Sequence, residues 1–303
     1  MDGYLYFRDS NTLHKMKLVV TLALFSILTF AFTYNLDLKI QKSSDEYVQA
    51  PLTDTTIVFK RGSGNSSVKV HYKEYQDTFG FNIGTIVLLP GWNYSSLDWC
   101  NKTDLCKLAE EWGYNVILVD MSKSTYSSQY YPETRADMRR YATRTWFKDT
   151  LTPFFQEEYG QLLEGGNNYI LGLSTGGRGA SLLCLDLPDI FKKGASLSGD
   201  YNQNSMPTDN LMRIFYGSHS KFKERWTGED NVVYNLDRFT VPFYIGHGLK
   251  DNVVPFKQSV EFYDSLKVHQ PDLNVVFHVD STAKHDYKYW GSEVKNVIQF
   301  FLD

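Results

Sequence analysis

The chain has 303 residues, of which 42% are hydrophobic, 22% charged and 16% aromatic. This composition excludes an intrinsically disordered protein, which needs low hydrophobicity and a high net charge. Thirty-one basic against 35 acidic side chains give a formal net charge of −4, so binding of nucleic acid through a basic surface is not expected.

The N-terminal segment differs from the rest of the chain. Residues 18–36 carry no charged side chain and follow Lys15 and Lys17. As a helix they would be long enough to cross the roughly 30 Å hydrocarbon core of a bilayer, with the basic flank inside. The pattern is also typical of a secretory signal, more so if translation starts at Met16. Residues 1–37 are therefore predicted to be a signal sequence or a signal anchor. The remainder would be secreted, periplasmic or membrane-anchored outside the cytoplasm.

Residues 38–54 are polar and are interpreted as a linker, and residues 55–303 as one domain. Residues 55–60 and 67–73 flank a Gly-rich turn and predict a β-hairpin. Short apolar runs then alternate with helical stretches. Strands are expected at residues 85–89, 115–119, 168–173, 193–197, 239–245 and 274–279, and helices at 103–112, 145–163, 177–186, 256–267 and 292–301. This alternation predicts a doubly wound α/β fold with a mostly parallel sheet, whose ligands bind beyond the carboxyl ends of the strands.

A G-x-S-x-G motif surrounds Ser174, between a predicted strand and a predicted helix. In that context the turn lifts the serine hydroxyl above the sheet as a nucleophile. The alternative is a Gly-rich turn with an incidental serine. Ser174 is the candidate nucleophile because both flanking elements agree with the motif.

Two later loops supply an acid and a base. Asp251 follows the strand predicted to end at residue 245, and His285 follows the strand predicted to end at residue 279. A carboxylate that orients a histidine, and a histidine that deprotonates a serine, complete a catalytic triad in the order expected for this sheet. Asp200 is the alternative acid, His247 a supporting residue of the Asp251 loop, and His278 a residue facing the core or a helix.

The loop after residue 89 is expected to complete an oxyanion hole. A tetrahedral oxyanion needs one amide from the residue after the nucleophile, here Thr175, and one from this loop. Gly91 permits close approach of the backbone, so Trp92 is the expected second donor and Asn93 the alternative.

The polar and aromatic segment 121–146 is interpreted as a substrate cradle or, equally, as a solvated loop. The residues proposed to contact substrate are Tyr126, Tyr130, Tyr131 and Arg135. Elsewhere, Cys100 and Cys106 can form a disulfide only if the residues between them are not a regular helix.

Residues 173–180 (LSTGGRGA) and 283–290 (AKHDYKYW) resemble the nucleophile and histidine segments of the esterase D-like group of α/β-hydrolases. Residues 247–255 (HGLKDNVVP) resemble the acid loop of dienelactone hydrolases and prolyl-oligopeptidase-type peptidases. The chain departs from the esterase pattern at Thr175, where Met is usual, and at Pro90-Gly91, where His-Gly is usual.

The resemblance implies a serine hydrolase that uses Ser174, Asp251 and His285. We expect a small-molecule or saccharide ester as the substrate, and neither cofactor nor metal, because a general base and an oxyanion hole suffice for this chemistry. The alternatives are a serine peptidase of the prolyl-oligopeptidase type, a perhydrolase or haloperoxidase with the same residues, and a non-catalytic binding protein with this fold.

Overall fold

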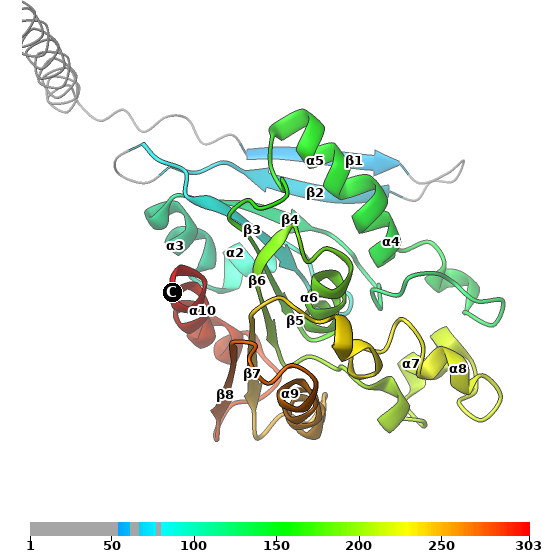
Figure 1. The fold of residues 1–303 in the computed structure, drawn as a ribbon. Coiled ribbons are helices and arrows are strands. Elements are labelled where there is room, and N and C mark those ends of the chain that lie inside the picture. The colour runs from blue at the N-terminus through cyan, green and yellow to red at the C-terminus, as the bar shows by residue number, and fades with distance from the viewer. Residues whose placement is uncertain (1–53, 61–66, 77–79) are drawn as a thin grey trace, which may run out of the picture. The chain divides into compact units, whose positions relative to one another are not determined.

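The computed structural model describes residues 54–60, 67–76 and 80–303 (Figure 1). The predicted signal sequence or anchor, and the predicted linker apart from Asp54, lie outside these residues. Within the described part of the chain, no helix combines the length and the apolar character needed to cross a membrane.

The described residues form a mostly parallel sheet of eight strands in the order β1-β2-β4-β3-β5-β6-β7-β8. The β1–β2 hairpin and the β2–β4 pair are antiparallel, and the other neighbours are parallel. This sheet confirms the predicted α/β fold. The strands are β1 (Asp54–Lys60), β2 (Ser67–Lys73), β3 (Gly84–Leu89), β4 (Tyr114–Val119), β5 (Asn168–Leu173), β6 (Phe191–Leu197), β7 (Phe243–Gly248) and β8 (Val275–Asp280).

Helices cover both faces of the sheet (Figure 1). One face is covered by α2 (Asp98–Lys102), α3 (Leu105–Trp112) and α10 (Tyr287–Leu302). The other is covered by α6 (Thr175–Asp186), α9 (Lys257–His269) and the continuous helical run of α4 (Arg144–Trp146), the π-helical turn η2 (Phe147–Leu151) and α5 (Thr152–Tyr159). The shorter helices are η1 (Ala136–Met138), η3 (Gln203–Ser205), α7 (Asn210–Tyr216), α8 (Lys223–Trp226) and η4 (Val233–Arg238).

Alternation of side chains along the central strands builds a separate apolar layer on each face. In β3, Ile86 and Leu88 pack into the layer beneath α3 and α10, whereas Val87 and Leu89 pack into the layer beneath α6 and α9. All four side chains are fully buried, and each such burial contributes about 1.5–3 kcal/mol. The two layers therefore hold the central strands rigidly, with their carboxyl ends at one edge.

Several predicted boundaries were wrong, among them the following three. The helix predicted for residues 145–163 ends at Tyr159, because Gly160 adopts a left-handed conformation with φ of 61°. The strand predicted for residues 239–245 begins only at Phe243, since residues 233–238 form η4. The helix predicted for residues 103–112 begins at Leu105 and follows a separate short helix, α2.

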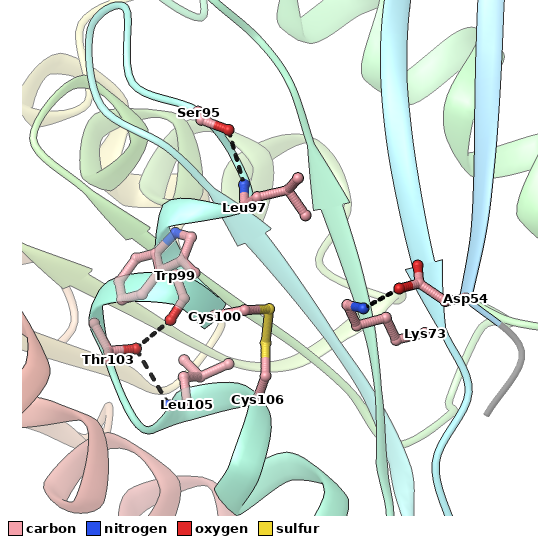
Figure 2. The surroundings of a disulfide bond; sticks show 9 residues. All are labelled: Asp54, Lys73, Ser95, Leu97, Trp99, Cys100, Thr103, Leu105 and Cys106. Atoms are coloured by element: carbon pink, nitrogen blue, oxygen red, sulfur yellow. Dashed lines mark hydrogen bonds and ion pairs between the residues drawn. A yellow bond between two sulfur atoms is a disulfide. The ribbon is translucent and has the colours of Figure 1, made fainter.

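The break between α2 and α3 brings two cysteines together. Thr103 is extended, and its hydroxyl donates to the carbonyl of Trp99 and accepts from the amide of Leu105. Cys100 and Cys106 are joined by a disulfide across this break (Figure 2). The condition stated for this disulfide, a segment that is not a regular helix, is met.

Candidate active site

Ser174 lies in the tight turn between β5 and α6. Its backbone angles, φ 54° and ψ −126°, belong to a region that residues other than glycine rarely adopt. A Cβ atom on Gly172 would lie only 1.9 Å from the carbonyl oxygen of Gly176, so the turn requires glycine there. Helix α6 begins immediately after the serine, at Thr175, two residues earlier than the sequence predicted.

A chain of hydrogen bonds joins Ser174, His285 and Asp251. The distance between Ser174 Oγ and His285 Nε2 is 2.9 Å, and that between His285 Nδ1 and Asp251 Oδ2 is 2.7 Å. An ionised carboxylate only accepts hydrogen bonds, so Nδ1 carries the proton and Nε2 is left to accept from the serine hydroxyl. The structure thus brings the three predicted residues together from the ends of β5, β7 and β8.

Asp251 is held by its own loop. Its Oδ1 accepts from the amides of Val253 and Val254, both at 2.9 Å. Its Oδ2 lies 3.3 Å from Nε2 of His247. Burial opposes ionisation of Asp251, but hydrogen bonds from His247 and His285 outweigh it and hold the pKa of the carboxyl well below its usual range. Asp251 is therefore a carboxylate at neutral pH.

His247 supports this carboxylate, as the sequence suggested. It is fully buried, with Nδ1 2.6 Å from the hydroxyl of Ser259 and Nε2 3.1 Å from the carbonyl of Val254. The carbonyl can only accept, so Nε2 carries the hydrogen and also points toward Asp251. The histidine joins α9 to the acid loop.

Trp290 is a residue that sequence reasoning missed. Its ring meets that of His285 edge-on, with centroids 5.0 Å apart, and its Nε1 donates to Ser198 Oγ at 3.2 Å. Packing of this kind fixes the plane of the histidine ring. The only signal in the sequence was its place in the histidine segment, in the first turn of α10.

The other candidate residues lie apart from this chain of hydrogen bonds. His278 pairs with Glu293, with 3.0 Å between Nδ1 and Oε2. Asp200 pairs instead with the fully buried Arg178, with 3.4 Å between Oδ2 and Nη1. Among the described residues Asp200 makes no hydrogen bond to His285, so the structure favours Asp251 as the partner of the histidine.

The loop after β3 lies against the nucleophile. A Cβ atom on Gly91 would approach Ser174 Cβ to 3.1 Å, which is tighter than ordinary contact. The amide of Asn93 donates to the carbonyl of Ser122 at 2.9 Å, so it is not free to bind an oxyanion. The amides of Trp92 in this loop and of Thr175 at the start of α6 remain the candidate donors, since the first amides of a helix have no partner within it.

Ser174 opens into a cavity of about 660 Å³. Its wall combines charged, polar and apolar side chains: Trp92, Lys123, Arg135, Thr175, Asp200, Met206, Asp209, Asn210, Leu211, Met212, Ile214, Val253, Val254 and Pro255. Arg135 is therefore placed at the cavity as predicted, but its guanidinium makes two hydrogen bonds to Asp137, at 2.5 and 3.0 Å.

The three tyrosines proposed to contact substrate do not line this cavity. Tyr126 is 1% exposed, and its hydroxyl donates to the carbonyl of Pro90 at 2.8 Å. It anchors the loop that carries Gly91 and Trp92 instead of meeting a ligand. Tyr130 packs against Phe215, and Tyr131 against Tyr216. The structure therefore gives no support to a substrate contact by these tyrosines: Tyr126 is buried beneath the loop after β3, and Tyr130 and Tyr131 pack against α7.

The described residues hold no group of three or more His, Cys, Asp or Glu side chains that could bind a metal ion. The chemistry available at the cavity is that of a serine, a histidine and a carboxylate in hydrogen-bonded sequence. On a mostly parallel sheet with a nucleophile turn after β5, this arrangement defines an α/β-hydrolase.

The sequence model of the prolyl oligopeptidase family matches residues 104–303, about two thirds of the chain. The protein belongs to this family. The match includes Ser174, Asp251 and His285, whereas the loop after β3 precedes it.

Solved structures show the same fold at low sequence identity. A fluorophosphonate-binding serine hydrolase of Staphylococcus aureus has a TM-score of 0.66 and 18% identity, over 84% of this chain and 100% of that one. An S-formylglutathione hydrolase of Agrobacterium tumefaciens has a TM-score of 0.64 and 14% identity, over 81% and 93%. An acylaminoacyl peptidase of Pyrococcus horikoshii has a TM-score of 0.60 and 18% identity, over 84% of this chain but 42% of that one. These likenesses agree with the α/β-hydrolase prediction.

Proposed function

We propose that this protein is a carboxylic-ester hydrolase that works through an acyl-enzyme on Ser174. The observation that carries the proposal is the unbroken chain of hydrogen bonds from Asp251 through His285 to the serine, which ends at a cavity. A serine hydroxyl is a weak nucleophile at neutral pH unless an adjacent base removes its proton. Here the base lies 2.9 Å away and is oriented by a buried carboxylate.

The reaction proceeds in two steps. In the first, Ser174 Oγ attacks the ester carbonyl while His285 Nε2 takes its proton, and the histidine then gives that proton to the departing alcohol as the C–O bond breaks. In the second, water attacks the acyl-enzyme while His285 Nε2 takes its proton, and the histidine then returns that proton to Ser174 Oγ as the acyl C–Oγ bond breaks and the acid is released. The amides of Thr175 and Trp92 bind the oxyanion in both steps. Asp251 stabilises the imidazolium.

A serine peptidase is the second candidate, favoured by membership of the prolyl oligopeptidase family. The match to the acylaminoacyl peptidase that shares the fold covers 42% of that peptidase. A binding protein without turnover is the third candidate, but binding alone gives no reason for a strained serine bonded to an oriented histidine.

We also propose export from the cytoplasm. The apolar residues 18–36 with their basic flank support it. The disulfide between Cys100 and Cys106 is consistent with it, because disulfides persist in oxidising compartments. Detection of the chain in exported and cytoplasmic fractions tests the proposal, and recovery in the cytoplasmic fraction alone would contradict it.

The direct test of the enzymatic proposal is labelling of the full chain with a fluorophosphonate probe, followed by mass mapping of the adduct. We expect one adduct, on Ser174, and none in Ser174→Ala, whose thermal unfolding should match that of the wild type. A comparison of small esters with peptide amides then separates esterase from peptidase. Absence of labelling in the folded protein would contradict a working nucleophile and favour the binding protein.

A further inference from the structure

The cavity beside Ser174 contains a carboxylate that the proposed triad does not use. Asp200 follows β6, is 4% exposed and lines the cavity. One of its oxygens, Oδ2, faces Arg178, whereas the other, Oδ1, is buried and has no hydrogen-bond partner among the described residues. Buried polar atoms are almost always hydrogen-bonded, so an unpartnered carboxylate oxygen at a cavity calls for a partner, which a bound water or a ligand can supply.

A second unpartnered atom lies next to the nucleophile. Thr175 Oγ1 is buried without a hydrogen-bond partner in the described part of the chain, and Thr175 lines the same cavity. A carboxylate can only accept a hydrogen bond, whereas a threonine hydroxyl can donate one as well. One ligand hydroxyl within reach of both atoms would satisfy both, because it would donate to the carboxylate and accept from the threonine.

Arg178 holds Asp200 in place from the side of α6. Its guanidinium donates to Gln203 Oε1 at 3.1 Å, to the Tyr216 hydroxyl at 2.8 Å and to the carbonyl of Asp230 at 2.6 Å, so it is fixed independently of Asp200. Its charge already balances that of the carboxylate, and a neutral hydroxyl therefore suits the site better than a cation. Burial, opposed by Arg178, raises the pKa of Asp200 to about 6, so that at neutral pH the group is mainly an acceptor.

We infer that Asp200 and Thr175 form a polar subsite that recognises a hydroxyl group of the ester substrate near its scissile carbonyl. The inference rests on the hydrolase activity proposed for Ser174. Apolar side chains of α7 line the same cavity and would contact the hydrocarbon part of such a substrate: Leu211, Met212 and Ile214. Esters without the hydroxyl leave Oδ1 of Asp200 without a hydrogen-bond partner, and we therefore expect them to have a lower kcat/KM.

The test uses two pairs of esters whose members differ by a single hydroxyl. 4-Nitrophenyl butanoate and 3-hydroxybutanoate probe the acyl side, and ethyl and 2-hydroxyethyl butanoate probe the alcohol side. We expect the wild-type chain to favour the hydroxylated member of one pair by at least tenfold in kcat/KM. The pair that shows the preference identifies the side on which the hydroxyl lies. Equal rates within both pairs would overturn the inference.

Variants assign the preference to the subsite. In Asp200→Asn the ratio within the favoured pair should fall to near one, because an uncharged amide is a weaker acceptor. In Asp209→Asn the ratio should persist. Asp209 also lines the cavity but caps α7 by accepting from the amide of Met212 at 2.9 Å, and asparagine caps equally well. Thr175→Val keeps the shape of the side chain and removes the hydroxyl, so it should lower the ratio of kcat/KM values within the favoured pair. If the Asp200 variant does not fold, this second variant tests the subsite. An unchanged ratio in both subsite variants would overturn the inference.

Binding to the Ser174→Ala protein separates this inference from the proposed activity. Calorimetry with the same ester pairs should give a dissociation constant about tenfold lower for the hydroxylated member, with no turnover involved. A binding preference without hydrolysis by the wild type would retain the subsite and reject the esterase. Hydrolysis by the wild type without a preference in binding or in rate would retain the esterase and reject the subsite.

Discussion

Replacement of Asp251 by asparagine tests the proposed acid without a change in side-chain size. In the wild type, Oδ1 accepts from the amides of Val253 and Val254 at 2.9 Å. The asparagine oxygen must take this position, since an NH₂ group there would face two donors. The NH₂ group then occupies the position of Oδ2, where it faces Nδ1 of His285. The histidine can accept from it only by moving its hydrogen to Nε2, which then cannot accept the proton of Ser174.

The expected loss is about three to four powers of ten in kcat, as the corresponding change produces in other serine hydrolases with this triad. It corresponds to about 4–5.5 kcal/mol of barrier at 1.36 kcal/mol for each factor of ten. KM should change little, because Asp251 does not line the cavity. The assay is steady-state hydrolysis of 4-nitrophenyl butanoate by the full chain, with thermal unfolding measured on the same samples.

Asp286→Asn is the matched control. Asp286 is adjacent to His285 but caps α10 by accepting from the amide of Tyr289 at 3.0 Å, a role that asparagine fills equally well. We expect this control to keep the wild-type rate. The reasoning would be refuted if folded Asp251→Asn protein kept more than a tenth of the wild-type kcat. Near-normal Asp251→Asn together with inactive Asp200→Asn would move the acid role to Asp200.

Gly91→Ala should lower kcat by 10- to 100-fold, since its Cβ would approach Leu173 Cδ1 to 2.9 Å and push the Trp92 amide from the oxyanion. Gly291→Ala, whose Cβ would meet nothing closer than 3.6 Å, should keep the wild-type rate, and equal rates in both variants would contradict the placement of this loop. The raised pKa of Asp200, about 6 against about 3.9 when unfolded, means that the folded state binds more protons between these values. The free energy of unfolding should therefore fall by up to about 3 kcal/mol as the pH rises from 4 to 6.5. Thermal unfolding measured across this range should show a smaller loss in Asp200→Asn. Combined replacement of Cys100 and Cys106 by serine should lower the free energy of unfolding by about 2 kcal/mol in urea titrations, and an unchanged midpoint would show that the disulfide adds no stability.

The parts of the site that the sequence could predict are those tied to strand ends. Ser174, Asp251 and His285 each follow a continuous apolar run, and parallel strands bring their carboxyl ends to one edge of the sheet whatever the details of packing. Proximity of the three residues therefore follows from topology alone. Helix and strand boundaries were less accurate because single residues decide them, as Gly160 does at the end of α5.

The contacts that the sequence could not predict depend on segments far apart in the chain. Tyr126 lies in a polar stretch and looks exposed, but its ring packs against Gly179 of α6, and its hydroxyl reaches Pro90. Likewise, the side chains around Arg178 come from residues 200–230, a region without a periodic pattern. No local pattern signals contacts of this kind, and they determine which residues line the cavity.

The placement of His285 after the last strand has a consequence for biosynthesis. A nascent chain that has emerged only as far as β7 already contains Ser174 and the residues of its turn, but neither the base nor α10, whose Trp290 packs against that base. Domains generally fold as units during synthesis. On the proposed mechanism a chain that stops before His285 has no hydrolytic activity, and the capacity to cleave esters appears only after β8 and the loop that carries His285 have been made.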